Sequence, residues 1–478
     1  MTGIPLPTGF RIELEPDARQ LSGELWFGGS PARVLRLTPA GRAAFDALHA
    51  GPVASPAAGV LARRLTDAGF ARPVPPAPAG PPDVTVVVPV HDRLDLVNRH
   101  LAALDGKHPV LVVDDASGDA AAVAAVAARY GARLVRRDVN GGPGAARNTA
   151  LAHVTTDLVA FLDSDCVPTD GWVDRLAAHF ADPLLAAIAP RVRPLAPDTL
   201  AGRYTRAAGS LDLGDRPARV APGTRMSYVP TAALLVRRAA LTSVAVDGAV
   251  FDPQLRVGED VDLVWRLHAA GHRIRYAPDV QVDHHEPATW RGLLGRRARY
   301  GTSAAPLARR HPDALAPLVL HPWPTLTVAA LLARRPVLAT AAFGGAVAST
   351  LRLLRANDVP TANVVRATAT AVEQTWLGCG RYSTQFAAPL VAALMVAGGP
   401  RRRGRRVALA SLLFGPPLVA WARRRPKLDP VRYTAAAVAD DIAYGAGVWA
   451  GCLKHRTTTP IRPAVATRAL RVDPKGKR

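Results

Sequence analysis

Apolar residues in the first third of the chain follow two alternating patterns. Continuous, mostly β-branched runs are typical of strands buried on both faces, and apolar residues at every third or fourth position are typical of helices. Strands that alternate with helices form parallel sheets of βαβ units, so the predicted fold class is α/β, with a doubly wound, mainly parallel sheet. The predicted strands are Val84–Val90, Val110–Val113, Arg133–Arg136 and Leu158–Leu162, and the predicted helices are Leu94–Leu104, Ala120–Tyr130 and Ala145–Ala152.

A smaller α+β unit is expected at residues 1–73. Thr38 followed by Pro39 predicts a helix start, because threonine caps helices and proline fits the first helical position. Six of the ten residues from Pro73 to Pro82 are prolines, which predicts an extended linker at residues 74–82 and a domain boundary. The other expected elements of the unit are strands at Phe10–Leu14, Leu25–Phe27 and Val34–Leu37 and a helix at Leu61–Gly69.

Residues 313–456 are rich in alanine, leucine and valine, after a sheet domain expected at 83–312. Most of their apolar stretches are shorter than the roughly 20 residues of a membrane-spanning helix. The pattern therefore leaves three interpretations of these stretches: buried helices, interfacial helices or membrane-spanning helices. Residues 457–478 are expected to form a disordered basic tail. The apolar stretches are Ala314–Ala333, Pro336–Leu351, Tyr382–Pro400 and Val407–Ala422.

The formal net charge of +22 attracts phosphorylated substrates, anionic lipid or nucleic acid. Arginine runs at Arg401–Arg406 and Arg423–Arg425 flank apolar segments, which favours a membrane face. Aromatic residues make up only 5% of the chain, which disfavours a nucleic-acid surface of interleaved basic and aromatic side chains. The three distant cysteines and the absence of a secretory signal pattern indicate the cytoplasm or the cytoplasmic side of the membrane.

Polar residues follow three of the predicted strands, where ligands of doubly wound sheets bind. They form the clusters Val90–Arg93, Asp114–Ser117 and Asp163–Asp165. Asp163 and Asp165 are one residue apart, so both carboxylates point to the same side of an extended chain. Mg²⁺ or Mn²⁺ bound there would be coordinated by carboxylate oxygens and by oxygens of a diphosphate. An Asx turn also explains such acids, but the buried strand and the other two clusters favour a metal site.

Two further features adjoin this edge of the sheet. Asp115 is placed to accept hydrogen bonds from a base or ribose, and it also suits a cap for the helix that starts at Ala120. Asn140–Asn148 is a glycine-rich turn into a helix, where the backbone and the helix N-terminus favour phosphate. The turn lacks a G-x-G-x-x-G pattern, so a dinucleotide cofactor is disfavoured.

Acidic residues open a predicted helix over Gly258–Leu267. The helix macrodipole stabilises negative charge at this position, which by itself accounts for the acids. The functional hypothesis is that Asp260 is a general base that takes a proton from an acceptor hydroxyl. Farther along, an imidazole in Val282–Glu286 is a candidate to complete the metal site, and His284 is the candidate chosen.

In order and spacing, five segments resemble the inverting family 2 glycosyltransferases, which have the GT-A fold. The resemblance implies a nucleotide-diphosphate sugar donor, a divalent metal (Mg²⁺ or Mn²⁺), and Asp260 as base. The Gln-x-x-Arg-Trp motif of processive synthases is absent, which disfavours open-ended polymer synthesis. The segments are Val84–Arg93, Val112–Ser117, Asn140–Asn148, Asp163–Asp165 and Gly258–Leu267. The residues assigned to donor binding are Val90, Asp92, Asp115, Asn140, Gly144, Arg147, Asp163 and Ser164. The residues assigned to the metal are Asp165 and His284. Glu259, Trp265 and Arg266 are assigned to acceptor binding or to support of the site.

Two flanking segments, Gly28–Gly41 and Arg296–Pro312, extend the resemblance to glycosyltransferases of the mycofactocin system. That system decorates a peptide-derived redox cofactor with β-1,4-linked glucose. The resemblance implies UDP-glucose as donor and a (pre)mycofactocin species as acceptor. Residues 1–73 also resemble winged-helix peptide-recognition domains, which implies that they hold the precursor or a pathway protein. A plain accessory domain explains them equally well.

Two other functions stay open. One is a membrane-associated transferase that extends a cell-envelope glycan or a lipid-linked sugar. The other is a basic protein that binds anionic surfaces through an inactive transferase core. The intact acids Asp115, Asp163, Asp165 and Asp260 argue against an inactive core.

Overall fold

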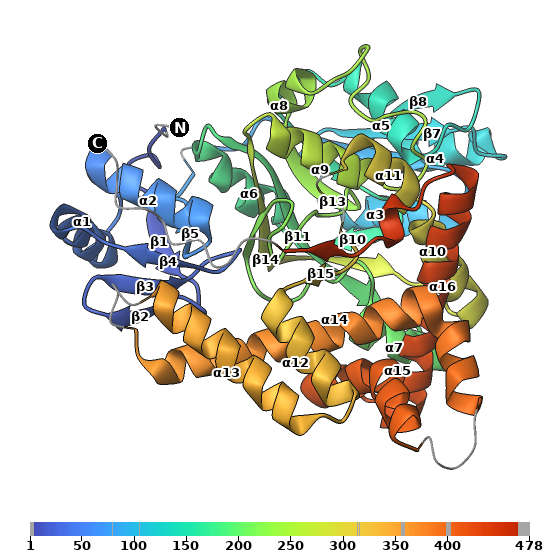
Figure 1. Ribbon diagram of the computed structural model, residues 1–478. Coiled ribbons are helices and arrows are strands. Elements are labelled where there is room, and N and C mark those ends of the chain that lie inside the picture. The colour runs from blue at the N-terminus through green and yellow to red at the C-terminus, as the bar shows by residue number, and fades with distance from the viewer. Residues whose placement is uncertain are drawn as a thin grey trace.

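The computed structural model describes residues 4–78, 80–104, 106–312, 314, 316–354, 359–397 and 403–466. Figure 1 shows a small N-terminal unit beside a larger sheet domain, with long C-terminal helices packed along the edge of both. The sheet domain therefore contacts both of the other parts, and its cavities lie where these parts meet.

The N-terminal unit consists of two small sheets and two helices. Strands β2, β3 and β4 are antiparallel, and β1 pairs with β5. Thr38 caps α1 as predicted, because its Oγ accepts a hydrogen bond from the N–H of Gly41. The sequence analysis missed β2 and β5, and β5 includes Val74, the first residue of the expected linker. The elements are β1 (Arg11–Leu14), β2 (Arg19–Ser22), β3 (Leu25–Gly28), β4 (Arg33–Arg36), α1 (Pro39–Ala50), α2 (Pro56–Ala68) and β5 (Ala71–Val74).

The central sheet has the strand order β10-β14-β11-β13-β9-β6-β7-β8, with β12 beside β14. Strands β9, β6, β7 and β8 are parallel, as predicted. Their bounds are β6 (Val84–Val90), β7 (Val110–Asp115), β8 (Arg133–Arg137) and β9 (Leu158–Leu162). The helices between them are α3 (Leu94–Ala103), α4 (Ala120–Arg129) and α5 (Pro143–Leu151).

Helices cover both faces of the sheet, as the continuous apolar runs predict. Val87 and Phe161 pack on the face with α5, α8, α9 and α11, while Val86 and Val88 pack on the opposite face with α3, α4 and α6. The doubly wound α/β prediction is thereby confirmed. The later helices are α6 (Trp172–Ala177), α7 (Leu200–Ala208), α8 (Arg238–Ser243), α9 (Glu259–Ala269), α10 (Trp290–Gly301) and α11 (Ala304–Arg310).

The second half of the sheet was not predicted from the sequence. Its strand β11 is rich in alanine and contains Pro190, next to a register shift in the pairing with β14. Alanine and proline are poor strand formers, which hides the strand pattern. The strands are β10 (Cys166–Pro168), β11 (Leu185–Leu195), β12 (Ala218–Val220), β13 (Ala233–Arg237) and β14 (Arg273–His285).

The C-terminal helices pack against the sheet domain through α10 and α16. A Cβ on Gly447 would lie 1.8 Å from the carbonyl oxygen of Ala298, so only glycine permits this close approach. Within the described residues, α13 is the helix that is long and apolar enough to cross a membrane, and 17% of it is buried. The helices are α12 (Pro322–Leu332), α13 (Pro336–Leu353), α14 (Thr361–Val396), α15 (Arg403–Arg424) and α16 (Pro430–Lys454).

The structure corrects two expectations for the C-terminal region. Of the expected apolar stretch at Tyr382–Pro400, residues 382–396 belong to the longer helix α14, and residues 398–400 lie outside the described residues. Helix α16 was not predicted. The expected disordered tail is ordered at its start, because β16 (Ala464–Val465) pairs with β15 (Val319–Leu320). Tail residues after 466 lie outside the described residues.

Candidate active site

The turns after β6 and β7 are joined by hydrogen bonds. The N–H of Asp92 donates to Ser117 Oγ at 2.8 Å, and Asp92 Oδ1 accepts from the N–H of Gly118 at 2.9 Å. Asp92, Arg93 and Ala116 have φ values of 56°, 57° and 61°. Residues other than glycine adopt this left-handed conformation at an energetic cost, which is tolerated mainly at functional sites. Asp92 therefore fixes the shape of the predicted ligand edge.

Asp115 holds the glycine-rich loop in place. Its two carboxylate oxygens accept hydrogen bonds from the N–H groups of Gly141 and Gly142, at 3.1 and 2.7 Å. Arg137 Nε lies 3.3 Å from the same carboxylate. The side chain thus connects the end of β7 to the turn that leads into α5.

Arg147 on α5 is a buried bridge between two acids of the predicted site. It donates hydrogen bonds to Asp163 Oδ1 at 2.6 Å and to Glu259 Oε1 at 3.0 Å, and its side chain is 1% exposed. Gly144 lies close to Phe251, because a Cβ there would be 3.3 Å from Phe251 Cβ, which is a tight contact. A buried arginine with two carboxylate partners fixes the end of β9 relative to the start of α9.

Asp165 and His284 lie side by side because β10 pairs with β14, with Cys166 opposite His284. His284 Nε2 is 3.4 Å from Asp165 Oδ1, and His284 Nδ1 is 3.0 Å from Glu286 Oε1. Burial alone would lower the pKa of His284, but hydrogen bonds to Asp165 and Glu286 raise it to about 9. Arg93 lies 3.4 Å from the other oxygen of Asp165.

This pair fits a divalent cation. Metal-binding histidines commonly give one ring nitrogen to the metal and donate from the other to a carboxylate, which matches the contact from His284 to Glu286. Among the described residues there is no group of three or more histidine, cysteine, aspartate or glutamate side chains arranged for a metal ion. Asp165 and His284 would supply two protein ligands, and the remaining ligands would then come from water or a substrate diphosphate.

Glu259 and Asp260 begin α9 but have different surroundings. Glu259 is buried and paired with Arg147. Asp260 lines the cavity, and its Oδ1 accepts a hydrogen bond from the N–H of Val261 at 2.8 Å. Burial, followed by the charge of Glu259, raises the pKa of Asp260 to about 7. A carboxyl group with such a pKa is well matched to general-base catalysis near neutral pH.

These groups surround a cavity of about 1740 Å³. Pockets for one ligand are usually about 300–1,000 Å³, so there is room for two substrates. The cavity is lined by half of the predicted residues, namely Arg147, Asp163, Asp165, Glu259, Asp260, Trp265 and His284. The predicted residues that do not line this cavity are Val90, Asp92, Asp115, Asn140, Gly144, Ser164 and Arg266.

Trp265 and Arg266 support the cavity wall. Trp265 Nε1 donates to the carbonyl of Ser227 at 2.8 Å. Arg266 donates to Asp262 Oδ2 and to the carbonyls of Val244 and Val250. Arg266 is therefore fully engaged within the protein.

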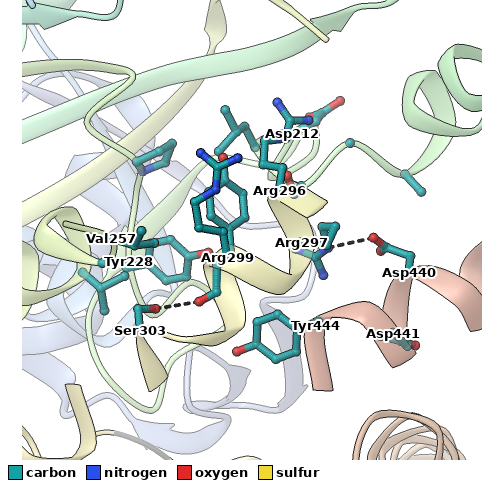
Figure 2. Close-up of a pocket in the computed structure, with 18 of the residues that line it drawn as sticks. Asp212, Tyr228, Val257, Arg296, Arg297, Arg299, Ser303, Asp440, Asp441 and Tyr444 are labelled. Atoms are coloured by element: carbon teal, nitrogen blue, oxygen red, sulfur yellow. Dashed lines mark hydrogen bonds and ion pairs between the residues drawn. The ribbon is translucent and has the colours of Figure 1, made fainter. Parts of the chain in front are cut away.

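The sequence analysis assigned no role to α10, which forms a basic wall of the cavity. Figure 2 shows Arg296, Arg297 and Arg299 along this helix, with Arg297 facing Asp440 of α16 at 2.8 Å. Arg296 pairs with Glu286, so the helix is tied to the Asp165–His284 pair. The run Arg296-Arg-Ala-Arg-Tyr300 was the sequence signal that could have identified this wall.

Residues of α14 and α16 also line the cavity. Asp441 accepts hydrogen bonds from Gln385 at 2.7 Å and from Arg381 at 3.2 Å. Tyr444 lies under Arg297, with 5.2 Å between the guanidinium carbon and the ring centre. The C-terminal helices therefore contribute polar and aromatic groups to the same cavity as the predicted donor site.

Comparisons with known proteins agree with this geometry. A model of glycosyl transferase family 2 matches residues 85–242. The chain is 38% identical to pre-mycofactocin glycosyltransferase of Mycobacterium tuberculosis, over 98% of this chain and 100% of that protein. This chain belongs to glycosyltransferase family 2. The predicted enzyme class is confirmed, and the alternative of an inactive core is set aside.

Two other proteins are similar to this family 2 glycosyltransferase over less of its length. Succinoglycan biosynthesis protein ExoU of Rhizobium meliloti is 32% identical, over 41% of this chain and 60% of that protein. The mannosyltransferase PcManGT from Pyrobaculum calidifontis, solved in complex with GDP-Man and Mn²⁺, is 22% identical. That match covers 80% of this chain and 89% of the mannosyltransferase, with a TM-score of 0.45.

Proposed function

We propose that this enzyme transfers glucose from UDP-glucose to a (pre)mycofactocin acceptor, with inversion at the anomeric carbon, and builds a short β-1,4-linked glucan. The acceptor assignment is supported by the full-length similarity to a protein named pre-mycofactocin glycosyltransferase. The catalytic assignment is carried by one observation: both adjacent acids line the cavity, but Glu259 is paired with Arg147, whereas Asp260 accepts a hydrogen bond from the N–H of Val261.

In this proposal each group has one task. Asp165 and His284 would hold Mg²⁺ or Mn²⁺, and the cation would supply Lewis-acid stabilisation of the departing diphosphate. Arg93 and the arginines of α10 add positive charge to the same region. Asp260 accepts the proton of the acceptor hydroxyl while that oxygen bonds to the anomeric carbon. The bond from that carbon to the diphosphate oxygen breaks at the same time, and its electron pair leaves with UDP.

The purified enzyme, incubated with a panel of nucleotide sugars and premycofactocin, tests the proposal. We expect transfer from UDP-glucose that requires Mg²⁺ or Mn²⁺, and a β-linked product by NMR. An α-linked product would overturn inversion. Transfer only from another nucleotide sugar would overturn the choice of glucose.

A second candidate acceptor is a cell-envelope glycan or a lipid-linked sugar at the cytoplasmic face of the membrane. The exposed apolar residues Val337 and Leu338 on α13 favour it, because such side chains suit a lipid surface. Mass analysis of cofactor species in a deletion strain separates the candidates. Unchanged oligoglucosylation would exclude the mycofactocin acceptor.

The N-terminal unit is proposed to hold the peptide-derived precursor or a pathway protein beside the transferase core. This role is supported by its firm attachment to that core. The buried Arg63 of α2 pairs with Asp182 of the core, and Asp67 of α2 pairs with Arg273. A pull-down of the full-length protein with the precursor peptide tests this role.

A further inference from the structure

A second cavity lies between the N-terminal unit and the sheet domain. Its volume is about 470 Å³, and none of its lining residues lines the active-site cavity. One wall is the sheet, where Arg275 of β14 pairs in register with Ile188 and Arg219. The other walls are the helical turn Ala178–Ala181 and the N-terminal unit around β5. In Figure 1, β5 and α6 lie on either side of this junction.

Arg275 lines this cavity without a hydrogen-bond partner for two of its nitrogens. The residue is 6% exposed, and both Nε and Nη2 are buried and unpaired. The acids whose charges raise the pKa of Arg275 most are Asp182 and Asp67, and both are already paired with other arginines. Burial lowers the pKa of Arg275 to about 10, against the opposing charges of Asp182 and Asp67. Native proteins rarely leave a buried guanidinium in this state.

The unpaired nitrogens define the shape of the missing partner. Nε and Nη2 form one edge of the guanidinium, and this edge donates two parallel hydrogen bonds to a carboxylate. His179 Nδ1 is also buried and without a hydrogen-bond partner. Burial, followed by the charge of Arg275, lowers the pKa of His179 to about 4, so this imidazole is neutral. Arg275 therefore presents a positive charge to the cavity beside a neutral imidazole, which suits an anion.

Other features of the cavity indicate what carries the carboxylate. Glu15 Oε2 is a buried acceptor without a donor, so the same cavity can receive an N–H group. The segment from Pro73 to Ala77 and the side chain of Ile188 provide apolar walls. A volume of about 470 Å³ lies within the usual range of about 300–1,000 Å³ for small-ligand sites. A lone anion would leave most of this space empty.

We propose that this cavity binds a peptide-like ligand through its carboxylate, held by the Nε–Nη2 edge of Arg275, with a ligand N–H on Glu15. The ligand is a free C-terminal segment or a small peptide-derived molecule. The site is separate from the reaction centre and does not depend on the identity of the donor sugar.

Calorimetric titration of the full-length protein tests this site without using catalysis. The probes are N-acetyl-Ala-Ala with a free C-terminus, the same peptide as a C-terminal amide, and inorganic phosphate. We expect the free acid to bind at least about tenfold more tightly than the amide, because the amide cannot accept both hydrogen bonds. Equal binding of acid and amide, or tighter binding of phosphate, would overturn the proposal.

Variants of Arg275 locate the binding. Arg275→Gln removes the charge and Arg275→Lys keeps it without the two-nitrogen edge, so both are expected to lose at least about tenfold in affinity for the free acid. Arg203→Gln, which removes a surface charge paired with Asp198, is the control and should bind normally. Thermal unfolding of each variant verifies folding. Unchanged affinity in folded Arg275→Lys would refute the role of this edge.

Discussion

Arg147 donates a hydrogen bond to Glu259 at 3.0 Å and thereby distinguishes two acids that are adjacent in the sequence. Glu259 is held in a buried ion pair, whereas Asp260 faces the cavity with a raised pKa. The sequence shows both acids at the start of one helix, and only the three-dimensional contact indicates which one is available to accept a proton.

Asp260→Asn is expected to lower kcat by about 10²–10⁴-fold, because general-base catalysis contributes about that much. UDP binding with Mn²⁺ should be unchanged, since Asp260 is not among the metal ligands. The raised pKa means that ionised Asp260 opposes folding at neutral pH, so the amide should not lower the thermal midpoint. Near-normal turnover in this variant would disprove the assignment of the base.

The pH dependence of the wild type follows from the same group. Asp260 is protonated below its pKa of about 7 and cannot then accept a proton. We therefore expect kcat/KM to rise about tenfold per pH unit on the acid side and to level off above about pH 7. The Asp260→Asn variant should lack this rise. A flat wild-type profile across this region would contradict the prediction.

Metal affinity is expected to depend on Glu286, which holds His284 by its Nδ1. Glu286→Gln should raise the Mn²⁺ concentration for half-maximal UDP binding by about 10–100-fold, the usual effect of losing such a partner. Asp165→Ala should weaken metal-dependent UDP binding further, because it removes a ligand. His272→Gln is the control, since His272 contacts Ser243 instead. If all three variants bind UDP equally well at low Mn²⁺, the metal site lies elsewhere.

Stability depends on the two-fold contact of Arg63 with Asp182, in which both nitrogen–oxygen distances are 2.6 Å. Arg63→Ala leaves a buried carboxylate unpaired and should lower the free energy of unfolding by about 3–5 kcal/mol. Arg42→Ala in the exposed pair with Asp46 should cost less than about 1 kcal/mol. Urea unfolding of both variants measures the contrast. Equal losses would mean that the buried pair contributes no more than a surface pair.

Membrane association is expected to depend on α13, where Val337 is 80% exposed and Leu338 is 59% exposed. Replacing both with serine should reduce sedimentation with anionic lipid vesicles, because it removes apolar area that lipid would cover. Unfolding should be unaffected, since neither side chain is buried. Val246→Ser changes a similarly exposed residue on the sheet domain and should sediment normally. Undiminished sedimentation of the double variant would place the lipid contact elsewhere.

The first half of the sheet could be predicted because β6, β7 and β9 are apolar on both faces, which leaves a continuous pattern in the sequence. Strand β11 could not, because its alanines and Pro190 weaken that pattern. The first part of helix α14 was missed because charged residues such as Arg366, Glu373 and Arg381 interrupt its apolar pattern.

Some features of the candidate site could likewise be predicted from the sequence, and others could not. The spacing of Asp163 and Asp165 after a buried strand is visible in the sequence, as are the acids that start α9. The contact of His284 with Asp165 depends on antiparallel pairing between β10 and β14, which are far apart in the chain. The contribution of α16 depends on its close approach to α10, which Gly447 allows, and no local sequence pattern predicts this contact.

Strand β14 also sets a length scale. It has a register shift relative to β11, so Arg275 and His284, nine residues apart on β14, pair with Ile188 and Pro194, which are only six residues apart on β11. At about 3.3 Å per residue of β11, the separation is about 20 Å. A peptide anchored by its carboxylate at Arg275 would need about six extended residues to reach the metal pair. The length of the strand between the two sites would then select acceptors by size, because only those long enough to span it would reach the reaction centre.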